Sequence, residues 1–233
     1  MAGRLSASGG GHATATAGGT PALLCGMCER QRPPYERALA YGPYDGALRD
    51  LIHLLKYARV HTAAPVLGRM LAEVVAGLAI PAERMLVVPV PLYQSKQRQR
   101  GFNQALEVTR AALKLMAPVA RGKYGLAAER LLRVRDTLSQ TGLTRYQRRE
   151  NVRGAFVAVD PESLRGQTVL LVDDVFTTGT TVSECAKVMR RAGAAQVYVA
   201  TVARVLKNDA ALLEPPDDGF EQDEPTTTRA AHA

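Results

Sequence analysis

Residues 169–181 read VLLVDDVFTTGTT, and this stretch decides the fold. Its apolar run, VLLV, has the continuous hydrophobic character of a parallel strand that is covered on both faces. The run stops at Asp173 and Asp174, a loop rich in threonine and glycine follows, and residues 180–192 then have a helical pattern that ends at Gly193. A buried strand, a short polar loop and a helix in this order predict an α/β unit with a ligand site at the carboxyl end of the strand.

The segments around this unit repeat the alternation of strands and helices. Two further apolar runs, at residues 85–90 and 197–204, have the character of buried strands. Helical periodicity covers residues around 39–58, after a short strand-like start and a turn, and then residues 63–79 and 103–116. The sequence therefore predicts an α/β domain in which helices flank a mainly parallel central sheet.

The two ends of the chain differ in composition from its middle. Residues 1–20 are rich in Gly, Ala, Ser and Thr, and residues 209–233 are acidic and lack periodicity, so both segments are expected to be disordered. One domain is expected between them, at residues 21–208. No apolar run has membrane-spanning length and the N-terminus lacks a secretory signal. The chain has three Cys without a disulfide framework, which favours a reducing cytoplasm.

Positive charge is concentrated in one region. The chain has a formal net charge of +8, and residues 96–153 alone hold 14 Lys/Arg against 4 Asp/Glu, which gives +10. This distribution predicts a local anionic partner. Aromatic residues make up only 5% of the chain, so aromatic platforms that stack the bases of single-stranded nucleic acid are not indicated.

The loop after the acid pair has the features of an anion site. A helix N-terminus presents free backbone N–H groups and partial positive charge, and Gly179 lets the backbone approach a ligand closely. Hydroxyls add further donors, from Thr177, Thr178, Thr180 and Thr181. Carboxylates only accept hydrogen bonds, so Asp173 and Asp174 fit the hydroxyls of a sugar. A ribose 5-phosphate would satisfy both halves; an acidic pair that merely caps the helix is the alternative without a ligand.

This segment resembles the phosphoribosyl diphosphate (PRPP) signature of type I phosphoribosyltransferases. The signature has four apolar residues, Asp-Asp, two apolar residues and a Thr/Gly-rich phosphate loop; Phe176 is bulkier than the aliphatic residue usual at its position. The resemblance implies a type I phosphoribosyltransferase-like fold and PRPP as ligand, with Mg²⁺ carried by PRPP as the cofactor. Asp173 and Asp174 would hold the ribose hydroxyls and residues 177–181 the 5-phosphate.

Two further segments narrow the resemblance. Residues 87–104, VVPVPLYQSKQRQRGFNQ, and residues 135–156, RDTLSQTGLTRYQRRENVRGAF, are similar to the ComF/GntX-type branch, the competence-protein phosphoribosyltransferases. The likeness spans about residues 25–204. Its most specific elements are RGFNQ and a T-x-x-Q…R-x-x-N…AF pattern, carried by Thr137, Gln140, Arg148 or Arg149, Asn151, Ala155 and Phe156.

A basic turn after the predicted strand at 85–90 is expected to bind pyrophosphate, because cations would lie at the carboxyl end of that strand. Lys56 belongs to an LKY element of the resembled family and is also expected to reach the diphosphate. The candidate pyrophosphate ligands are Lys96, Arg98, Arg100, Asn103, Gln104 and Lys56. A solvated basic loop and, for Lys56, a surface lysine at a helix C-terminus are the alternatives.

Residues 134–151 are polar and are predicted to form a long loop, which is typical of an active-site lid. Type I phosphoribosyltransferases have a mobile catalytic loop at the corresponding place. A closing lid would exclude water and bring cations to the leaving diphosphate, and its catalytic candidates are Arg145, Arg148 and Arg149. A flexible basic linker is the alternative.

Cys25 and Cys28 form half of a zinc knuckle. The resembled family often carries two such pairs, whereas here Cys185 lies on a predicted helix and is expected in the core. Because two thiolates do not complete a tetrahedral site, zinc is not expected within one chain. Sharing of a metal between two subunits, and a homodimer in general, stay open.

These features lead to two hypotheses for the function. The first is a Mg²⁺-dependent phosphoribosyltransferase that moves phosphoribosyl from PRPP to an unidentified nitrogen acceptor and releases pyrophosphate. The alternative is a PRPP- or nucleotide-responsive accessory protein in DNA uptake that does not turn over. Its partners would be single-stranded DNA or a DNA-uptake helicase, and the basic region would contact the phosphate backbone.

Overall fold

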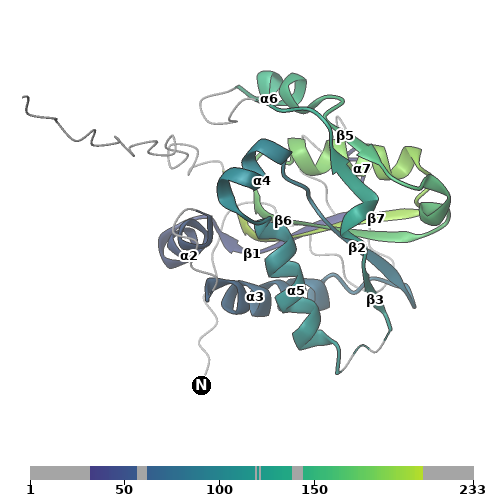
Figure 1. Cartoon of the computed structure of the whole chain (residues 1–233). Helices are drawn as coiled ribbons and strands as arrows, with labels where there is room; N and C mark the ends of the chain where they lie inside the picture. Colours follow the sequence, from purple (N-terminus) through teal and green to yellow (C-terminus); the bar gives the residue numbers. More distant parts are fainter. Residues whose placement is uncertain (1–31, 57–61, 119, 121, 138–143, 207–233) are drawn as a thin grey trace, which may run out of the picture.

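The computed structural model describes residues 32–56, 62–118, 120, 122–137 and 144–206. Its centre is a five-stranded sheet in the order β1-β7-β6-β2-β3, and every neighbouring pair of strands is parallel (Figure 1). The strands are β1 (Arg37–Pro43), β2 (Met85–Pro89), β3 (Tyr124–Leu126), β6 (Thr168–Phe176) and β7 (Gln196–Arg204). The predicted α/β fold with a mainly parallel sheet is confirmed.

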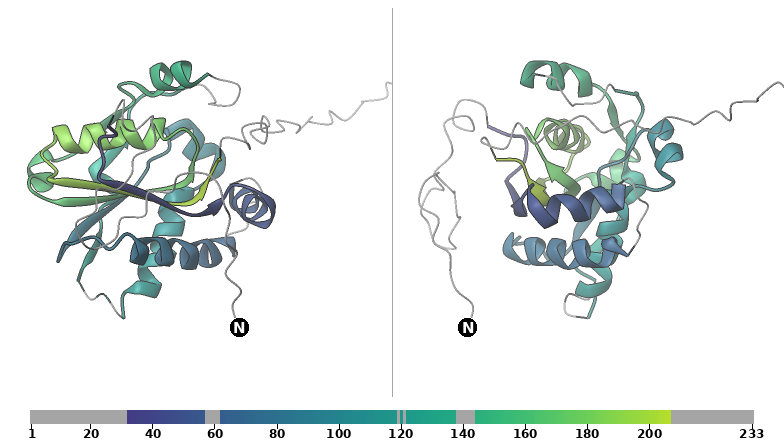
Figure 2. Two further views of the ribbon diagram at one scale, coloured as in Figure 1. Left: turned by 180° about the vertical axis from the view of Figure 1, so that it is seen from behind. Right: turned by 90° about the vertical axis from the view of Figure 1, so that its left-hand side faces the viewer.

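Helices cover both faces of the sheet (Figure 2). One face packs against α2 (Gly46–Lys56), α3 (Ala63–Gly77) and α5 (Gln104–Met116), and the other packs against α7 (Thr180–Arg191). Strand β6 contributes side chains to the hydrophobic core on each face of the sheet, because successive side chains of a strand point to opposite faces. Leu170 and Val172 join the core under α3 and α5, while Val169 and Leu171 join the core under α7.

Several short elements were not expected from the sequence. Strands β4 (Leu131–Arg133) and β5 (Phe156–Ala158) form a separate antiparallel pair. The prediction of a turn after β2 is wrong over residues 94–100, because these residues form helix α4 (Gln94–Arg100). The helix is capped at its C-terminus by Gly101, whose φ is 84°. Because QSKQRQR has no apolar stripe, the periodicity that reveals most helices is missing there.

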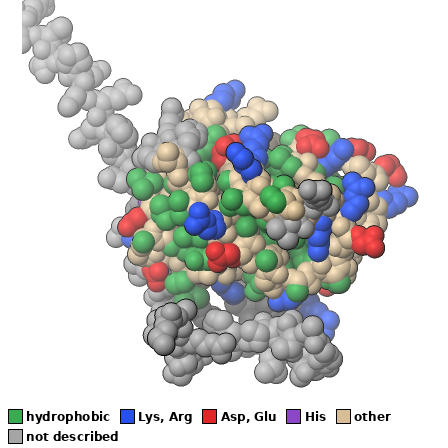
Figure 3. Space-filling model, turned by 90° about the horizontal axis from the view of Figure 1, so that it is seen from below, with side chains coloured by type: hydrophobic (Ala, Val, Ile, Leu, Met, Phe, Trp, Pro, Cys, Tyr) green, Lys and Arg blue, Asp and Glu red, His purple; other side chains and the backbone are tan. Residues whose placement is uncertain are grey.

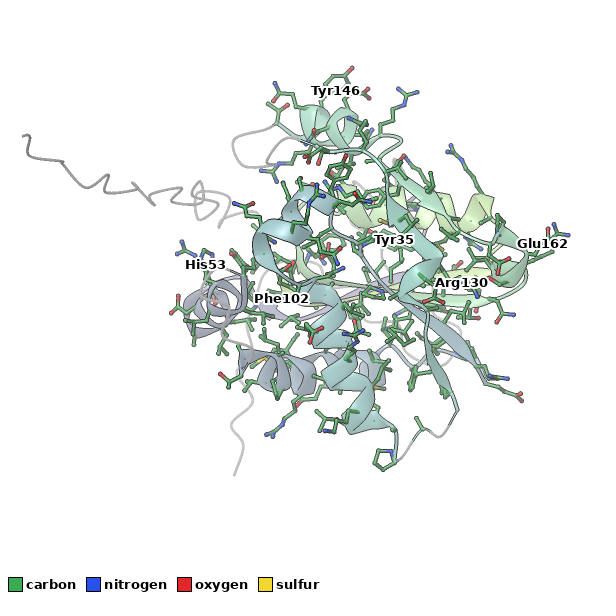
Figure 4. The ribbon with its side chains drawn as sticks, viewed as in Figure 1. Tyr35, His53, Phe102, Arg130, Tyr146 and Glu162 are labelled. Atoms are coloured by element: carbon green, nitrogen blue, oxygen red, sulfur yellow. The ribbon has the colours of Figure 1, made fainter. Side chains whose placement is uncertain are left out.

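The loop predicted over 134–151 is also wrong in its second half, where helix α6 (Arg145–Val152) forms. Thr144 explains its start: the hydroxyl accepts a hydrogen bond from the Gln147 N–H, and the Gln147 side chain accepts one from the Thr144 N–H. Helix α6 stands above α4 and α7 in Figures 1 and 2. Tyr146 points away from the body there (Figure 4) and is 74% exposed.

Some expectations concern residues outside the described part of the chain. These are the leader at 1–20, the tail at 209–233, the Cys25 and Cys28 pair, and Gln140. Within the described residues, no helix is both long enough and apolar enough to span a membrane.

Candidate functional site

The acid pair lies at the carboxyl end of β6, half-buried at the edge of the packed interior. Strand β6 is an inner strand of the sheet, between β2 and β7. Its carboxyl end lies on the side of the sheet where open α/β proteins bind their ligands. The backbone N–H of Asp174 donates to Oδ1 of Asp173 at 2.9 Å. The two side chains then meet different surroundings on the two faces of the sheet.

Asp174 meets Lys56, the last residue of α2. Lys56 Nζ lies 2.9 Å from Asp174 Oδ2, and both side chains are largely buried, with exposed fractions of 17% and 14%. Burial opposes ionisation of Asp174, but the Lys56 ammonium, together with Arg100 and the Val175 N–H, outweighs it and holds the pKa of Asp174 below its ordinary value. Burial likewise opposes the charge on Lys56, and Asp174 overcomes this and raises the pKa of Lys56. This lysine is therefore a buried counter-ion of the acid pair.

Asp173 has a different charge state. Burial and then the adjacent Asp174 carboxylate raise the pKa of Asp173 to about 8. Near neutral pH the pair thus holds one ionised and one largely protonated carboxyl group, since two buried carboxylates side by side resist double ionisation.

The loop after the acid pair leads directly into the first turn of α7. Gly179 adopts the left-handed conformation with a φ of 71° and caps the start of α7. The hydroxyls of Thr178 and Thr180 lie 2.7 Å apart, and the first turn of α7 presents backbone N–H groups as helix N-termini do. Thr177 and Thr181 are half-buried in the same segment. Asp173 interacts electrostatically with Cys185 of α7 and so lies on the side of the sheet that this helix covers.

The unusual Phe176 is accommodated by Gly179. A Cβ on Gly179 would lie 2.5 Å from Cζ of Phe176, so the ring fills the space where any other residue would have its side chain. The guanidinium of Arg204, at the end of β7, lies over the same ring at 5.1 Å from its centroid. The Phe176 ring therefore lies between the Arg204 guanidinium and Gly179, and it supports the loop that follows the acid pair.

The three predicted basic ligands on α4 differ in their exposure to solvent. Lys96 and Arg100 are half-buried, one helical turn apart, whereas Arg98 is exposed. Burial, and then Arg133 and Arg100, lower the pKa of Lys96, and Arg100 also acts electrostatically on Asp174. The structure brings Arg100 near the acid pair, places Lys96 near Arg100, Arg133 and Asp136, and leaves Arg98 in solvent.

Asn103 and Gln104 open α5, as predicted, but both have structural contacts. Asn103 donates to the Val90 carbonyl at 3.0 Å and accepts from the Leu106 N–H at 3.4 Å, so it ties the end of β2 to the helix. Gln104 is only 2% exposed and accepts from Arg100 at 3.2 Å. Its Nε2 is buried without a hydrogen-bond partner among the described residues.

The lid candidates lie on α6. Arg148 is buried, which lowers the pKa of its guanidinium, while Arg149 is exposed. The side chain of Arg145 is outside the described part of the structure. The catalytic role of all three remains a prediction.

Sequence reasoning missed Arg133, on β4. Its guanidinium donates to the Thr137 hydroxyl and lies over the Phe156 ring at 5.4 Å, and it interacts electrostatically with Asp173. Its Nε is buried without a hydrogen-bond partner among the described residues. The alternation LLRVR contained the signal: Leu132 and Val134 are exposed, so the arginine between them points inward.

Helix α4 and the segment after β4 also meet directly. Ser95 Oγ donates to Asp136 Oδ2 at 2.9 Å, which joins the two elements that supply cations. Basic side chains from three separate elements therefore act on the Asp pair, namely Lys56, Arg100 and Arg133, and Lys96 lies near Arg100, Arg133 and Asp136.

Comparisons with known proteins agree with this geometry. Residues 117–229 match the family model described as the phosphoribosyl transferase domain. The chain is 35% identical over 196 residues to the DNA utilization protein YhgH of Salmonella typhi, and the match covers 81% of each chain. It is 32% identical over 184 residues to competence protein F of Haemophilus influenzae, covering 77% of this chain and 78% of the relative.

One solved structure with a similar segment is the glutamine PRPP amidotransferase of B. subtilis, complexed with ADP and GMP. The match has a TM-score of 0.38 and 24% identity, and it covers 61% of this chain but 26% of the amidotransferase chain. The curated relatives match over most of their length and over most of this chain. The chain therefore belongs to the ComF/GntX-type (competence protein) family of type I phosphoribosyltransferases.

Proposed function

We propose that this protein binds Mg²⁺·PRPP at the carboxyl end of β6 and transfers the phosphoribosyl group to a nitrogen nucleophile, releasing pyrophosphate. One observation carries the proposal: the acid pair is followed within a few residues by a left-handed glycine and the N-terminus of α7. Acceptors for sugar hydroxyls thus lie beside donors for a phosphate. Ribose 5-phosphate combines both groups in one molecule.

The cations around the acid pair suit the leaving group. When pyrophosphate departs from the ribose C1 atom, positive character builds on the sugar and negative charge builds on the diphosphate. Fixed cations near the developing negative charge lower the barrier, since they need no reorganisation during the reaction. Lys96 and Arg100 from α4 and Arg133 from β4 would serve in this way. A carboxylate near C1 would balance the positive character of the sugar.

Mg²⁺ fits this site as part of the substrate. No group of three or more His, Cys, Asp or Glu side chains in the described part of the chain could hold a metal ion. Mg²⁺ keeps several of its water ligands and is often held through substrate phosphates, so it would enter the site with the diphosphate of PRPP. When bound with PRPP, the ion would neutralise charge on the diphosphate.

A titration with PRPP tests the proposal, followed by a measurement of pyrophosphate release. PRPP should bind with Mg²⁺ and more weakly in EDTA, and a panel of bases and amines should include an acceptor that releases pyrophosphate. The Asp173→Asn/Asp174→Asn double variant should lose more than about tenfold in PRPP affinity, the expected effect of losing charged hydrogen-bond acceptors. The matched control, Glu73→Gln/Glu83→Gln, likewise replaces two carboxyl groups by amides, but at exposed positions, and should bind normally. Unchanged PRPP affinity in the aspartate variant would contradict the proposal.

A second function is favoured by the relatives' names and by the +10 charge of residues 96–153. The protein would then be a PRPP-responsive accessory protein in DNA uptake that does not turn over. PRPP binding without pyrophosphate release, for every acceptor in the panel, would favour this function over the transferase.

A further inference from the structure

The ion pair between Lys56 and Asp174 lies inside the proposed ribose site, where a divalent cation would otherwise neutralise two adjacent carboxyl groups. We infer that Lys56 takes the place of such a metal ion. The acid pair would then bind ribose 5-phosphate esters, nucleoside 5′-monophosphates included, without a divalent cation. The inference rests on the proposed function and assigns Mg²⁺ to the diphosphate of PRPP alone.

The lysine is fixed in place before any ligand arrives. Ile52 and Leu55 of α2 are each 1% exposed and anchor the helix in the core. The hydroxyl of Tyr44 and Nε2 of His53 lie 2.8 Å apart, and the Tyr44 N–H donates to the Arg204 carbonyl at 2.9 Å, which ties the start of α2 to the end of β7. Lys56 therefore reaches Asp174 from a rigid support.

The acid pair keeps capacity for a sugar after Lys56 has bound. Asp173 Oδ1 accepts from the Asp174 N–H, Asp174 Oδ2 accepts from Lys56, and the Val175 N–H also acts on Asp174. An ionised carboxylate has about four acceptor positions, and a protonated carboxyl group has an O–H donor and further acceptor capacity, so both side chains can still hydrogen-bond to a ribose diol.

A metal ion at the pair would have to displace the ammonium. Breaking a buried ion pair leaves a charge without its partner in a poorly solvated place, which is strongly unfavourable. Mg²⁺ also loses its water ligands reluctantly. With Lys56 present, the acid pair is thus a poor Mg²⁺ site; without Lys56 it becomes two neighbouring buried carboxyl groups that need a cation.

The opposite role for Lys56 is that of a plug that blocks the ribose site. The two roles predict changes of opposite sign. A counter-ion holds Asp174 as an acceptor, so its removal weakens ribose 5-phosphate binding. A plug occupies the acceptor, so its removal strengthens binding.

The experiment titrates ribose 5-phosphate into wild type, Lys56→Met and Lys114→Met, each in EDTA and in millimolar Mg²⁺. Lys114 is an exposed lysine near the end of α5 and serves as the matched control. The wild type and Lys114→Met should bind equally well with and without Mg²⁺. Lys56→Met should bind at least about tenfold more weakly in EDTA, the loss expected of a charged hydrogen bond, and should regain most of this affinity in Mg²⁺. Tighter binding by Lys56→Met in EDTA, or affinity within about twofold of wild type, would overturn the inference.

A second measurement uses Mg²⁺ alone and needs no sugar phosphate. Carboxyl ¹³C NMR should show Mg²⁺-induced shifts at Asp173 and Asp174 in Lys56→Met but not in wild type. Shifts of equal size at equal Mg²⁺ in both proteins would overturn the inference even if neither protein bound ribose 5-phosphate. Conversely, a folded wild type that binds neither ribose 5-phosphate nor Mg²⁺·PRPP would overturn the proposed function, whatever the Mg²⁺ shifts show.

Discussion

Asp173 and Asp174 are neighbours in the sequence, yet their carboxyl groups have different neighbours because strand side chains alternate between faces. Asp174 meets Lys56 from α2, whereas Asp173 lies on the side of Arg133 and the buried Cys185. Cys185 is a core residue, as its position on a predicted helix suggested. This burial, and then the electrostatic effect of Asp173, raise the pKa of its thiol well above the usual value. One carboxyl group is charged and the other holds a proton near neutral pH.

The raised pKa of Asp173 predicts a pH-dependent stability. In the folded protein the pKa is about 8, against an ordinary value of 3.8. Between these values the folded state binds a proton that the unfolded state has released, so this contribution to stability is complete below about pH 4 and is lost as pH rises toward about 8. Asp173→Asn removes the titration. Its free energy of unfolding, measured in urea, should gain more than about 1 kcal/mol relative to wild type between pH 5 and pH 8.

The control for this prediction is Glu73→Gln, which removes an exposed carboxylate. Its stability should follow the wild-type pH dependence. Parallel curves for Asp173→Asn and wild type across this range would show that Asp173 titrates normally.

Gly179 is predicted to be required for two separate reasons. Its φ of 71° is unfavourable for other residues, and a Cβ would meet the Phe176 ring. Gly179→Ala should lower the free energy of unfolding by about 1–3 kcal/mol and weaken PRPP binding, because the ring or the loop must move. Denaturant unfolding and PRPP titration measure the two effects.

Gly166→Ala separates the two causes. Gly166 has a φ of 73°, and no atom lies within 4 Å of the place that a Cβ would occupy, so this variant has the backbone strain without the clash. It should lose less stability than Gly179→Ala, and Phe176→Leu in the Gly179→Ala background should restore part of the difference. Equal losses for the two glycine variants would exclude the ring contact as a cause.

At the scale of elements, α4 has no apolar side. Its two sides differ in whether their basic residues are half-buried or exposed to solvent. It has no buried residue, yet Lys96 and Arg100 face inward and Arg98 does not. Lys96→Met and Arg100→Met should each weaken pyrophosphate binding by about tenfold, as expected for a charge-assisted contact, whereas Arg98→Met should change it by less than about twofold. Isothermal titration with pyrophosphate and Mg²⁺ compares the three. Equal losses would instead support the basic turn first predicted from the sequence.

The elements that the sequence predicted are those with long apolar patterns. The strands at 85–90 and 197–204 and the helices at 63–79 and 103–116 correspond to β2, β7, α3 and α5 within a few residues. Strands β4 and β5 have three residues each, too few for a periodic pattern. Helix α6 is signalled only by the capping pair Thr144 and Gln147, which a search for apolar periodicity overlooks.

At the scale of the whole molecule, the site is assembled from segments that are distant in sequence. The acid pair and the phosphate loop are one continuous stretch and could be predicted from it. The ion pair with Lys56 and the approach of Arg133 depend on how α2 and β4 pack against the sheet. No local pattern encodes those distances, which is why the sequence revealed neither the ion pair of Lys56 with Asp174 nor the role of Arg133; the contact of Lys56 with the diphosphate stays a prediction.

The concentration of positive charge along the chain does not produce a uniformly basic surface on every face. On the face seen from below in Figure 3, basic and acidic side chains are interspersed with hydrophobic ones. Several cations of residues 96–153 are also half-buried at the candidate site, including Lys96, Arg100 and Arg133. The charge available to an extended polyanion is therefore carried by the exposed members of this region, such as Arg98 and Arg153.

The affinities for PRPP and for single-stranded DNA should consequently differ in how steeply they fall with salt concentration. Charges in a half-buried site are screened weakly, so PRPP affinity at constant Mg²⁺ should fall less than about fivefold between about 50 and 200 mM salt. Single-stranded DNA that contacts about five phosphates through exposed cations should lose about a hundredfold over the same range, through counter-ion release. Fluorescence anisotropy with labelled DNA and PRPP competition measures both. Arg98→Gln/Arg153→Gln should make the DNA slope shallower by about 1.4 units and leave the PRPP affinity unchanged, because each of the two lost phosphate contacts contributes about 0.7. If PRPP displaced DNA and both affinities had the same salt slope, the two ligands would share one site, and the basic region would serve DNA at the acid pair itself.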